Sequence, residues 1–318
     1  MLFLIMSNLD TKYLTVKKYA SYKDYLADSA GVDKEIIEIL NFDTGIIKKA
    51  RSEGFFFMPN YISYIRKTNS FESVLKGLSK NKRKKIRKAR DAFESDDSLK
   101  IITEKHVSED SFKEWYNNIY LKNLDEKDYA ILIANESWYK EDLDKAQKAG
   151  MFVSRNGKII GGIVGKSFVA GTQFPERMSI SYSAFLKDFS QSGFNDYLNA
   201  CFIDFVYKMG YDWVSRGQDT NFYAKHLSPG IAVFKSALRY EIFPNKNKGD
   251  ILIKINDFDN LRKEIFFVSY NENLELEGNL IFKTNPDAGK VKMYHNEALK
   301  RMNVYCLAGK NELKPFSN

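Results

Sequence analysis

The sequence MSISYSAF (residues 178–185) begins the segment from which the fold class is inferred, and its apolar residues alternate with serines as in a half-buried β-strand. A glycine-containing turn, SQSGFND (190–196), leads into a long amphipathic helix that ends at Gly210. YDWVSRG (211–217) has the composition of a second strand, and SPGIAVFKSALRYE (228–241) that of a helix followed by a third strand. Strand, turn, helix, strand, helix and strand in this order predict an α/β fold.

The periodicity of these elements predicts which side chains are buried. Alternation places four apolar residues of the strand 178–185 on one face, opposite its serines: Met178, Ile180, Tyr182 and Ala184. A period of 3.6 residues places five apolar residues on the buried stripe of the helix that follows: Leu198, Cys201, Phe202, Phe205 and Met209.

The composition excludes several classes of protein. A chain of 318 residues with 44% hydrophobic residues can bury a sizeable core, in one large domain or two ordinary ones. No apolar run reaches the length of a membrane span, and MLFLIM (1–6) has neither the basic region nor the cleavage site of a signal peptide. Cys201 and Cys306 form no spacing pattern, which favours a reduced, cytoplasmic protein. The three histidines are scattered, so we expect no metal site.

The positive charge is concentrated in one short segment. The chain has 49 basic and 41 acidic residues, and eight of the basic ones lie in Lys80–Arg90, which contains no acid. Without this segment, 41 basic residues face 41 acidic ones, so the excess is a local patch. The patch is either a solvated helix face, a contact for a polyanion such as tRNA, or a contact for an anionic membrane surface.

Turn residues and periodicity predict further helices and strands outside 178–241. Asn156-Gly157 is the strongest turn signal in the chain and predicts a β-hairpin over 151–168. The other predicted elements are strands within 54–65 that are interrupted at Pro59, a helix over 70–93, a strand over 99–107, and helices over 110–121 and 136–150, the last closed by Gly150. Residues 250–318 are strand-like and polar.

Two segments resemble the GNAT acyltransferases, and in particular their Fem-type branch of aminoacyl- and acyl-transferases. The order of elements over 178–241 is similar to the donor-binding half of the GNAT fold, and Phe234-Lys235 is similar to a Phe-Lys pair of the Fem-type branch. LSKNKRKKIRKARDAF (78–93) resembles a second Fem-type segment, which it matches at Ser79, Asn81, Arg83, Ile86, Arg87, Lys88 and Ala89. The resemblance extends over residues 70–245.

The resemblance implies a mixed, largely antiparallel sheet that splays at one point and is flanked by helices. It also implies three parts: a degenerate N-terminal α/β part over 1–95 that ends in the basic helix, a GNAT-like acyltransferase domain over 96–248, and a C-terminal extension over 249–318. Fem-type proteins often contain two GNAT-like halves, and 1–95 is too short for a full one. Either this degenerate second half is trimmed, or the tail from about residue 250 folds back to complete it.

The resemblance also implies where the donor, an acyl-CoA or an aminoacyl-tRNA, is bound. The implied donor-binding residues are Ser181, Ser183, Gln191, Ser192, Gly193, Asn195 and Phe234. The turn keeps one of the two glycines usual in GNAT enzymes, has Asn195 in place of the second, and lacks the basic residue unless Lys187 replaces it. Phe234 stands where a typical member has a tyrosine that protonates the leaving thiolate, which counts against ordinary acetyl-CoA chemistry.

Five residues are candidates for catalysis or substrate binding in this half. The resemblance implies that Lys235 offsets charge on the acyl oxygen, whereas the residue alone reads as a solvated surface lysine. Tyr223, His226 and Asp219 are candidate bases for the acceptor amine, unless the substrate assists its own deprotonation. Arg216 either grips a carboxylate or phosphate or pairs with Asp219.

The resemblance therefore implies an N-acyltransferase whose acceptor is an amine on a peptide, a cell-wall precursor, an amino acid or an amino sugar. The basic residues Arg83, Arg87 and Lys88 would contact the polyanion, together with Arg216. Two alternatives remain open. One is a non-catalytic RNA-binding module on a GNAT scaffold, and the other is a peripheral-membrane enzyme with a long-chain donor.

Overall fold

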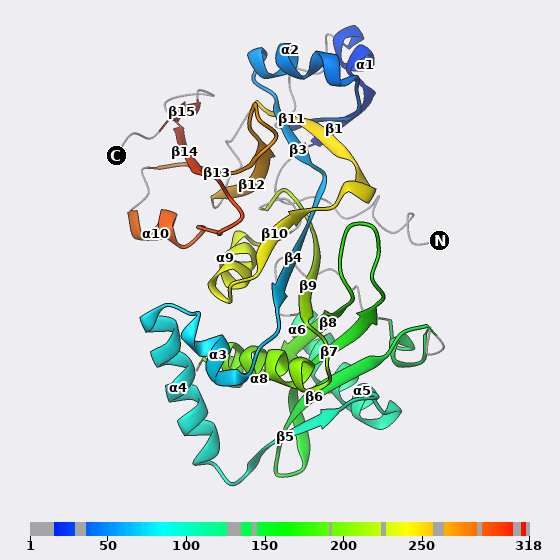
Figure 1. The fold of residues 1–318 in the computed structure, drawn as a ribbon, viewed down its shortest axis with the longest axis vertical. Coiled ribbons are helices and arrows are strands. Elements are labelled where there is room, and N and C mark those ends of the chain that lie inside the picture. Colours follow the sequence, from blue (N-terminus) through cyan, green and yellow to red (C-terminus); the bar gives the residue numbers. More distant parts are fainter. Residues whose placement is uncertain are drawn as a thin grey trace. The chain divides into compact units, whose positions relative to one another are not determined.

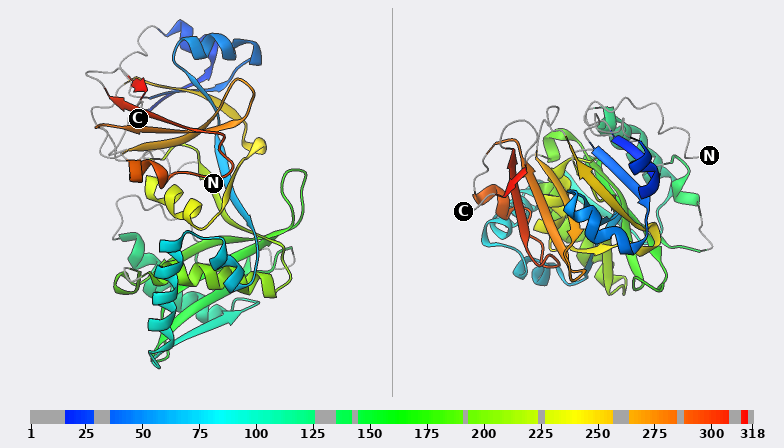
Figure 2. Two further views of the ribbon diagram at one scale, coloured as in Figure 1. Left: turned by 60° about the vertical axis from the view of Figure 1, so that its left-hand side comes forward. Right: turned by 90° about the horizontal axis from the view of Figure 1, so that it is seen from above.

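A computed structural model describes residues 16–28, 36–125, 135–141, 145–190, 193–223, 227–256, 264–284, 288–307 and 313–315 (Figures 1 and 2). The chain packs as two compact units. Unit 1 comprises residues 1–62, 218–236 and 242–318, and unit 2 comprises residues 63–217 and 237–241. The three-part division at residues 95 and 248 stays a prediction about domains.

A seven-stranded sheet dominates unit 2 (Figure 1). The order of its strands is β10-β4-β9-β8-β7-β6-β5, and one end of β4, one end of β9 and most of β10 belong to unit 1. The strands are β4 (Tyr61–Lys67), β5 (Leu99–Glu104), β6 (Lys148–Arg155), β7 (Lys158–Phe168), β8 (Arg177–Phe185), β9 (Trp213–Thr220) and β10 (Glu241–Pro244). The pairs β5–β6, β6–β7 and β7–β8 are antiparallel, and β8–β9 is parallel. This mixed, largely antiparallel sheet confirms the predicted fold class.

The predicted hairpin is present as β6 and β7. Asn156 and Gly157 join the strands with φ angles of 51° and 80°. Both residues of this tight turn therefore have the positive φ that Asn-Gly tolerates better than other pairs.

A β-bulge in β8 changes which residues face which side of the sheet. Val164 of β7 pairs with Tyr182, whereas the next residue, Gly165, pairs with Ile180, so Ser181 is an extra residue in β8. Paired residues share a face and adjacent residues alternate, so Ile180 and Tyr182 lie on opposite faces. The prediction that Met178, Ile180, Tyr182 and Ala184 share one face was therefore wrong, because the bulge reverses the alternation at Ser181.

Helices cover both faces of this sheet. On one face α8 (Phe194–Lys208) brings Phe202 to Gly165, and α3 (Phe71–Lys76) and α4 (Lys80–Glu94) pack against α8 (Figure 1). On the other face an aromatic cluster joins Trp115 and Tyr120 to Val164 and Tyr182. That cluster comes from α5 (Glu109–Trp115), the π-helix η4 (Tyr116–Tyr120) and α6 (Leu121–Asp125). Short helices α7 (Lys187–Ser190) and η5 (Trp138–Lys140) complete the described helices of this unit.

The predicted helix over 70–93 is two helices. α3 ends at Lys76, and α4 begins after Ser79, whose side chain accepts a hydrogen bond from the Lys82 N–H and caps the new helix. The apolar stripe is nevertheless buried as predicted: Val74, Leu75, Leu78, Ile86, Ala89 and Phe93.

The predicted helix over 136–150 is absent from the residues described in that range. η5 covers only Trp138–Lys140, and Lys148 and Gly150 belong to strand β6. Lys148 is buried, and its ammonium donates to the carbonyl oxygens of Trp138 and Glu141. These carbonyls, which come from outside the strand, stabilise the buried charge of Lys148 within β6. The local periodicity of the sequence had favoured a helix here.

Unit 1 contains two four-stranded sheets. The first has the order β1-β2-β11-β3, with β1 (Val16–Ser21), β2 (Ile36–Asn41), β3 (Phe56–Pro59) and β11 (Asp250–Ile255). β11 is antiparallel to both β2 and β3, so the tail folds back onto the N-terminal segment (Figure 2). The second sheet has the order β12-β13-β14-β15, with β12 (Ile265–Tyr270), β13 (Leu276–Phe282), β14 (Met302–Leu307) and β15 (Leu313–Pro315).

Apolar side chains from both sheets form one core in unit 1, in which Met58, Ile253, Ile265 and Phe267 are buried together. The helices of the unit are short: α1 (Tyr22–Ala27), η3 (Thr44–Ile46), α2 (Ile47–Ser52), α9 (Pro229–Ala237), η6 (Lys246–Lys248) and α10 (Ala288–Lys292). Within the described parts of the chain, no helix has the length and apolar character needed to cross a membrane.

Candidate functional site

The parallel strands β8 and β9 of unit 2 pair over only two residues and then part. The pairs are Met178 with Val214 and Ser179 with Ser215, and the hydroxyls of the two serines are 2.7 Å apart. The bulge at Ser181 follows at once on β8. Strand edges that lose their neighbour keep backbone N–H and C=O groups to which an extended ligand can pair.

Polar side chains line the place where the two strands separate. Arg216 of β9 donates from Nη2 to the hydroxyl of Ser183 on β8 over 3.3 Å. Gly217, next along β9, has a φ of 74°. The structure thus brings together Ser183 and Arg216, two of the predicted site residues, and Ser181 is the bulge residue of the same strand. A guanidinium at this point suits a carboxylate or phosphate oxygen.

The N-terminus of α8 holds a second group of polar residues in unit 2. Gly193 is the N-cap, with a φ of 89°, and Lys85 of α4 crosses it so closely that an added Cβ would lie 2.9 Å from Lys85 Cε. Asp196, in the first turn, is buried and accepts from Lys82 Nζ at 2.7 Å, with Lys85 Nζ at 3.3 Å. Two lysines thus lie at a helix end that itself attracts anions, and one carboxylate offsets part of their charge.

The other residues of the predicted turn contribute differently. Asn195 accepts from Asn199 Nδ2 over 2.8 Å, so its side chain braces the first turn of α8. Gln191 and Ser192 lie outside the described residues.

A buried cluster in unit 1 joins Lys235 to Asp219 and Tyr223. Lys235 Nζ lies 2.7 and 2.6 Å from the two carboxylate oxygens of Asp219, and the Tyr223 hydroxyl donates to Oδ2 over 2.5 Å. Lys235 is only 5% exposed, so it is not the solvated surface lysine that its sequence alone suggested. Asp219 pairs with Lys235, and the pairing of Arg216 with Asp219 stays a prediction.

Neighbouring hydrogen bonds fix this cluster in place. Asn221 Nδ2 donates to the carbonyls of Pro59 and Val268, each over 2.7 Å, and its Oδ1 accepts from the Val268 N–H. The Tyr223 N–H donates to the Phe266 carbonyl over 2.9 Å. The segment that carries Asp219 and Tyr223 is therefore held against β3 and β12. Phe234, beside Lys235 on α9, is half-buried, and His226 lies outside the described residues.

Acids from distant parts of the chain neutralise half of the basic helix α4. Besides the contacts of Lys82 and Lys85 with Asp196, Arg87 and Arg90 lie within 3.9 and 3.3 Å of Glu72. Arg83 donates to the Lys76 carbonyl over 3.0 Å. The exposed lysines without an ion pair to any described residue are spaced four apart along the helix: Lys80, Lys84 and Lys88.

The sequence did not predict the roles of several residues at these sites, because those roles depend on contacts between distant segments of the chain. Asp196 belongs to the buried side of α8, and nothing local indicates that it meets two lysines from α4. Tyr182 faces the aromatic cluster only because of the bulge, and burial raises its pKa to about 12. The Tyr182 phenol is therefore neutral near pH 7. Among the described residues, no three His, Cys, Asp or Glu side chains gather as metal ligands would.

Comparison with known proteins finds similarity only at the level of solved structures. No protein-family model and no curated protein matches the chain. FemX is similar with a TM-score of 0.43 and 12% identity, over 72% of this chain and 76% of FemX. The C-terminal domain of a protein described as a lysylphosphatidylglycerol synthetase from Agrobacterium fabrum has a TM-score of 0.41 and 13% identity, over 69% and 67%. L-PGS from Bacillus licheniformis has a TM-score of 0.38 and 17% identity, over 73% and 71%.

The features that define the fold are nevertheless visible in this chain itself. Unit 2 has an antiparallel run of strands, a bulged strand, a helix, and a parallel strand that parts from the bulged one after two residue pairs. This arrangement is the splayed sheet that the sequence predicted. The chain accordingly has a GNAT-like fold.

Proposed function

We propose that this protein is an N-acyltransferase that binds its donor along β8, where β9 separates from it. The observation that carries the proposal is the bulge at Ser181 together with the two-residue pairing of β8 and β9. A parallel pair that ends so early in an otherwise continuous sheet leaves backbone groups for a ligand, and Ser183 and Arg216 add polar side chains at the same place.

The proposed reaction transfers an acyl or aminoacyl group from a thioester or ester to an amine. The amine nitrogen attacks the acyl carbon, a C–N bond forms, and the C–S or C–O bond breaks. The nitrogen loses a proton, and the leaving sulfur or oxygen gains one. Holding the donor in one orientation contributes to the rate by itself, which is the role we propose for Ser181, Ser183 and Arg216.

The buried cluster of unit 1 supplies the proposed catalytic residues Lys235, Asp219 and Tyr223, with His226 as a further candidate base. Asp219 lies 2.6 Å from Lys235 and offsets its charge, so the pair acts on a substrate as a fixed dipole and not as an isolated cation. Asp219 can serve as a base only if it exchanges one of these contacts for the acceptor amine. Substrate-assisted deprotonation is the alternative.

Two donors suit the proposed site, an acyl-CoA and an aminoacyl-tRNA. The N-terminus of α8, with Gly193, Asn195, Lys82 and Lys85, would face the pyrophosphate of coenzyme A. The lysine stripe Lys80, Lys84 and Lys88 suits the phosphates of tRNA, with Arg83, Arg87 and Arg216 as further contacts. Phe234 is a proposed donor contact in unit 1.

The test measures both donors against the same variants. Coenzyme A binding is followed by calorimetry, aminoacyl-tRNA binding by filter retention, and transfer by mass increase of an amine acceptor. Arg216→Ala should weaken binding of the true donor about tenfold or more, since a bidentate anion contact is lost. Arg155→Ala, at an exposed arginine at the end of β6, is the matched control and should change nothing. Failure of folded wild-type protein to bind either donor would refute the proposal.

A second test addresses tRNA as the partner of α4. Lys84→Gln with Lys88→Gln should reduce the slope of log affinity against log salt by roughly 1.4–1.8, because each lost phosphate contact contributes about 0.7–0.9. Lys105→Gln with Lys158→Gln removes the same charge from exposed sites elsewhere in unit 2 and should leave the slope unchanged. RNA binding that responds to α4 while no transfer is detectable would favour the non-catalytic alternative.

A further inference from the structure

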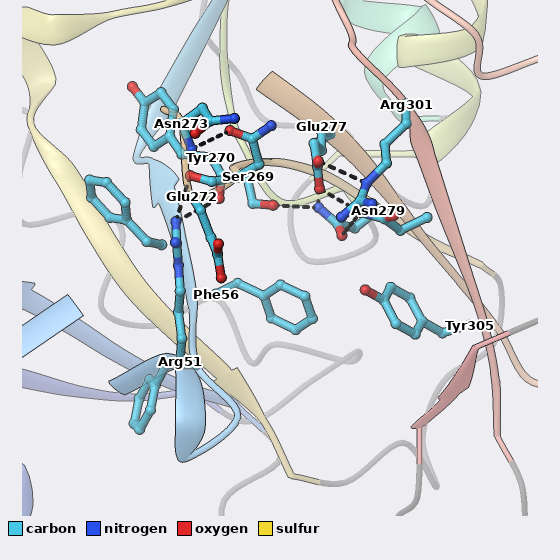
Figure 3. A pocket seen from close by; sticks show the side chains of 14 residues that line it. Arg51, Phe56, Ser269, Tyr270, Glu272, Asn273, Glu277, Asn279, Arg301 and Tyr305 are labelled. Atoms are coloured by element: carbon cyan, nitrogen blue, oxygen red, sulfur yellow. Dashed lines mark hydrogen bonds and ion pairs between the residues drawn. The ribbon is translucent and has the colours of Figure 1, made fainter. Parts of the chain in front are cut away.

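Unit 1 contains a pocket that the proposed transfer chemistry does not use (Figure 3). Its volume is about 420 Å³, within the range of roughly 300–1,000 Å³ typical of small-molecule sites. Strands β12, β13 and β14 supply its polar side, through Ser269, Glu277, Asn279 and Asn303. Phe56 of β3 and Tyr305 of β14 add two aromatic rings to the lining (Figure 3).

The strand register explains why these polar residues share one face. Ser269 of β12 pairs with Glu277 of β13, and Asn279, two residues on, pairs with Asn303 of β14. Residues two apart point to the same side of a sheet, so all four lie on one face. Both edges of β13 are occupied by β12 and β14, so a ligand in the pocket meets side chains and not a free strand edge.

Hydrogen bonds hold the polar residues in fixed orientations. Asn279 Nδ2 donates to the Ser269 hydroxyl over 2.8 Å, and Asn303 Nδ2 donates to Glu277 Oε2 over 2.9 Å. Arg301 Nε lies 2.8 Å from Glu277 Oε1. Glu277 and Asn279 are 5% and 1% exposed, so the network is built into the sheet and is not a surface cluster. Such pre-organisation lowers the entropy that a ligand would otherwise lose on binding.

The formal charges of the side chains that line the pocket add up to zero. Arg301 is paired with Glu277, and Arg51 donates from Nη2 to the carbonyls of Tyr270 and Asn271, each over 2.9 Å. Glu272 adds a second carboxylate to the lining, so two arginines face two acids. A phosphate or a nucleotide would therefore find no net positive charge here.

Several groups of the pocket can still bond to a ligand. Among the described residues, the Tyr305 hydroxyl and the Arg301 Nη atoms have no hydrogen-bond partner. Burial raises the pKa of Tyr305, so its phenol is a protonated donor at neutral pH. Each carboxylate oxygen of Glu277 has one described partner and a further lone pair. The pocket thus offers donors and acceptors together, as hydroxyl and amide groups require.

The apolar side of the pocket is equally well fixed. The Phe56 ring packs edge-on against Phe267 at 4.9 Å between centroids and against Tyr305 at 6.1 Å. A ligand that contacts both the aromatic rings and the polar residues needs one apolar face and a rim of hydroxyl or amide groups. A pyranose ring has this amphipathic shape, because its C–H bonds form apolar faces and its hydroxyls lie around the edge.

We propose that this pocket binds a neutral pyranose sugar, either free or as the end of a larger glycan. The site is independent of the proposed donor site in unit 2, so loss of one activity leaves the other measurable. For a monosaccharide of this size we expect a Kd on the order of 1 mM.

The test is saturation-transfer NMR followed by calorimetry on the full chain. The probes are glucose, galactose, mannose and N-acetylglucosamine, with inorganic phosphate and trialanine as non-sugar ligands. UDP-N-acetylglucosamine is included because it carries the same sugar on an anion. We expect at least one neutral sugar to bind, phosphate and trialanine not to bind, and the UDP-linked sugar to bind no more tightly than the free one.

Two variants test whether the sugar binds in this pocket. Asn303→Ala should weaken it about tenfold, and Tyr305→Phe, which removes one hydroxyl and keeps the ring, should weaken it severalfold with little risk to folding. Asn247→Ala, at an exposed asparagine of η6 in the same unit, is the matched control and should leave the Kd unchanged. Absence of binding to every sugar, binding that ignores both pocket variants, or tighter binding of the UDP form through Arg301 would overturn the proposal.

Discussion

Breaking the buried ion pair of unit 1 should destabilise that unit strongly. Lys235 and Asp219 are 5% and 8% exposed, and Lys235→Met would leave the carboxylate buried with the Tyr223 hydroxyl but without its cation. Removing one partner of a buried pair costs about 3–5 kcal/mol. With a urea dependence of about 2 kcal/mol per molar, the unfolding midpoint should fall by roughly 1.5–2.5 M.

The double variant separates lost charge compensation from lost packing. Asp219→Asn with Lys235→Met removes both charges, so it should recover about half or more of the lost stability. Lys292→Met, at an exposed lysine of α10, is the matched control and should stay within about 0.5 kcal/mol of wild type.

Circular dichroism follows the unfolding of the whole chain, whereas tryptophan fluorescence reports on unit 2. All three tryptophans, Trp115, Trp138 and Trp213, belong to that unit. Lys235→Met should therefore shift the dichroism transition more than the fluorescence transition. A midpoint that moves by less than about 0.5 M, or a double variant no more stable than Lys235→Met, would refute the buried ion pair.

Three further predictions concern particular residues. Gly193→Ala should cost about 1–2 kcal/mol in urea unfolding followed by tryptophan fluorescence, because Gly193 has a φ of 89° and an added Cβ meets Lys85; an unchanged midpoint would contradict this. In the same assay Lys82→Met should cost about 1–2 kcal/mol and Lys85→Met less than half of that, because their side chains are 18% and 56% exposed; equal costs would contradict the buried contact with Asp196. Burial raises the pKa of Asp250, so the folded state favours its protonated form, and stability should fall as pH rises above about 4. Asp250→Asn should therefore raise the urea midpoint of unfolding at pH 7 but not below about pH 3.5. A gain in the midpoint that is independent of pH would contradict this prediction.

The elements around the proposed donor site were predictable because their signals are local. Asn156-Gly157 joins two strands as expected, since the positive φ of both residues depends on their own side chains. The strand, helix, strand and helix over 178–237 follow from periodicity within each segment, and Gly193 has the positive φ that a turn at this point requires.

The details that position the site were not predictable, because they depend on contacts between distant segments. The bulge at Ser181 arises from the pairing of β8 with β7, and alternation along β8 alone gives the wrong face for half of the strand. Lys235 and Asp219 are 16 residues apart, and no local pattern distinguishes this pairing from one between Arg216 and Asp219. The break after α3 depends on Ser79 acting as a cap inside an otherwise helical pattern.

Contacts between distant segments also explain why the charge of the basic helix α4 was overestimated from the sequence. Eight basic residues without a local acid suggested a uniformly cationic face, but Asp196 and Glu72 neutralise four of them from other helices. Arg83 and a stripe of three exposed lysines keep their charge without an ion pair to a described acid, so the cationic surface is narrower than the sequence suggested. Charge runs can be read from sequence, whereas their compensation requires the tertiary structure.

The proposed function requires that the donor lies along β8 where β9 parts from it, and amide hydrogen exchange can test this placement. Exchange is measured by mass spectrometry with and without acetyl-CoA, and with and without aminoacyl-tRNA. Slower exchange over residues 180–185 and 215–217 with one of the two donors is the result that the structure predicts. Exchange that is unchanged in both segments with either donor, in protein that is folded and otherwise binds that donor, would contradict the claim.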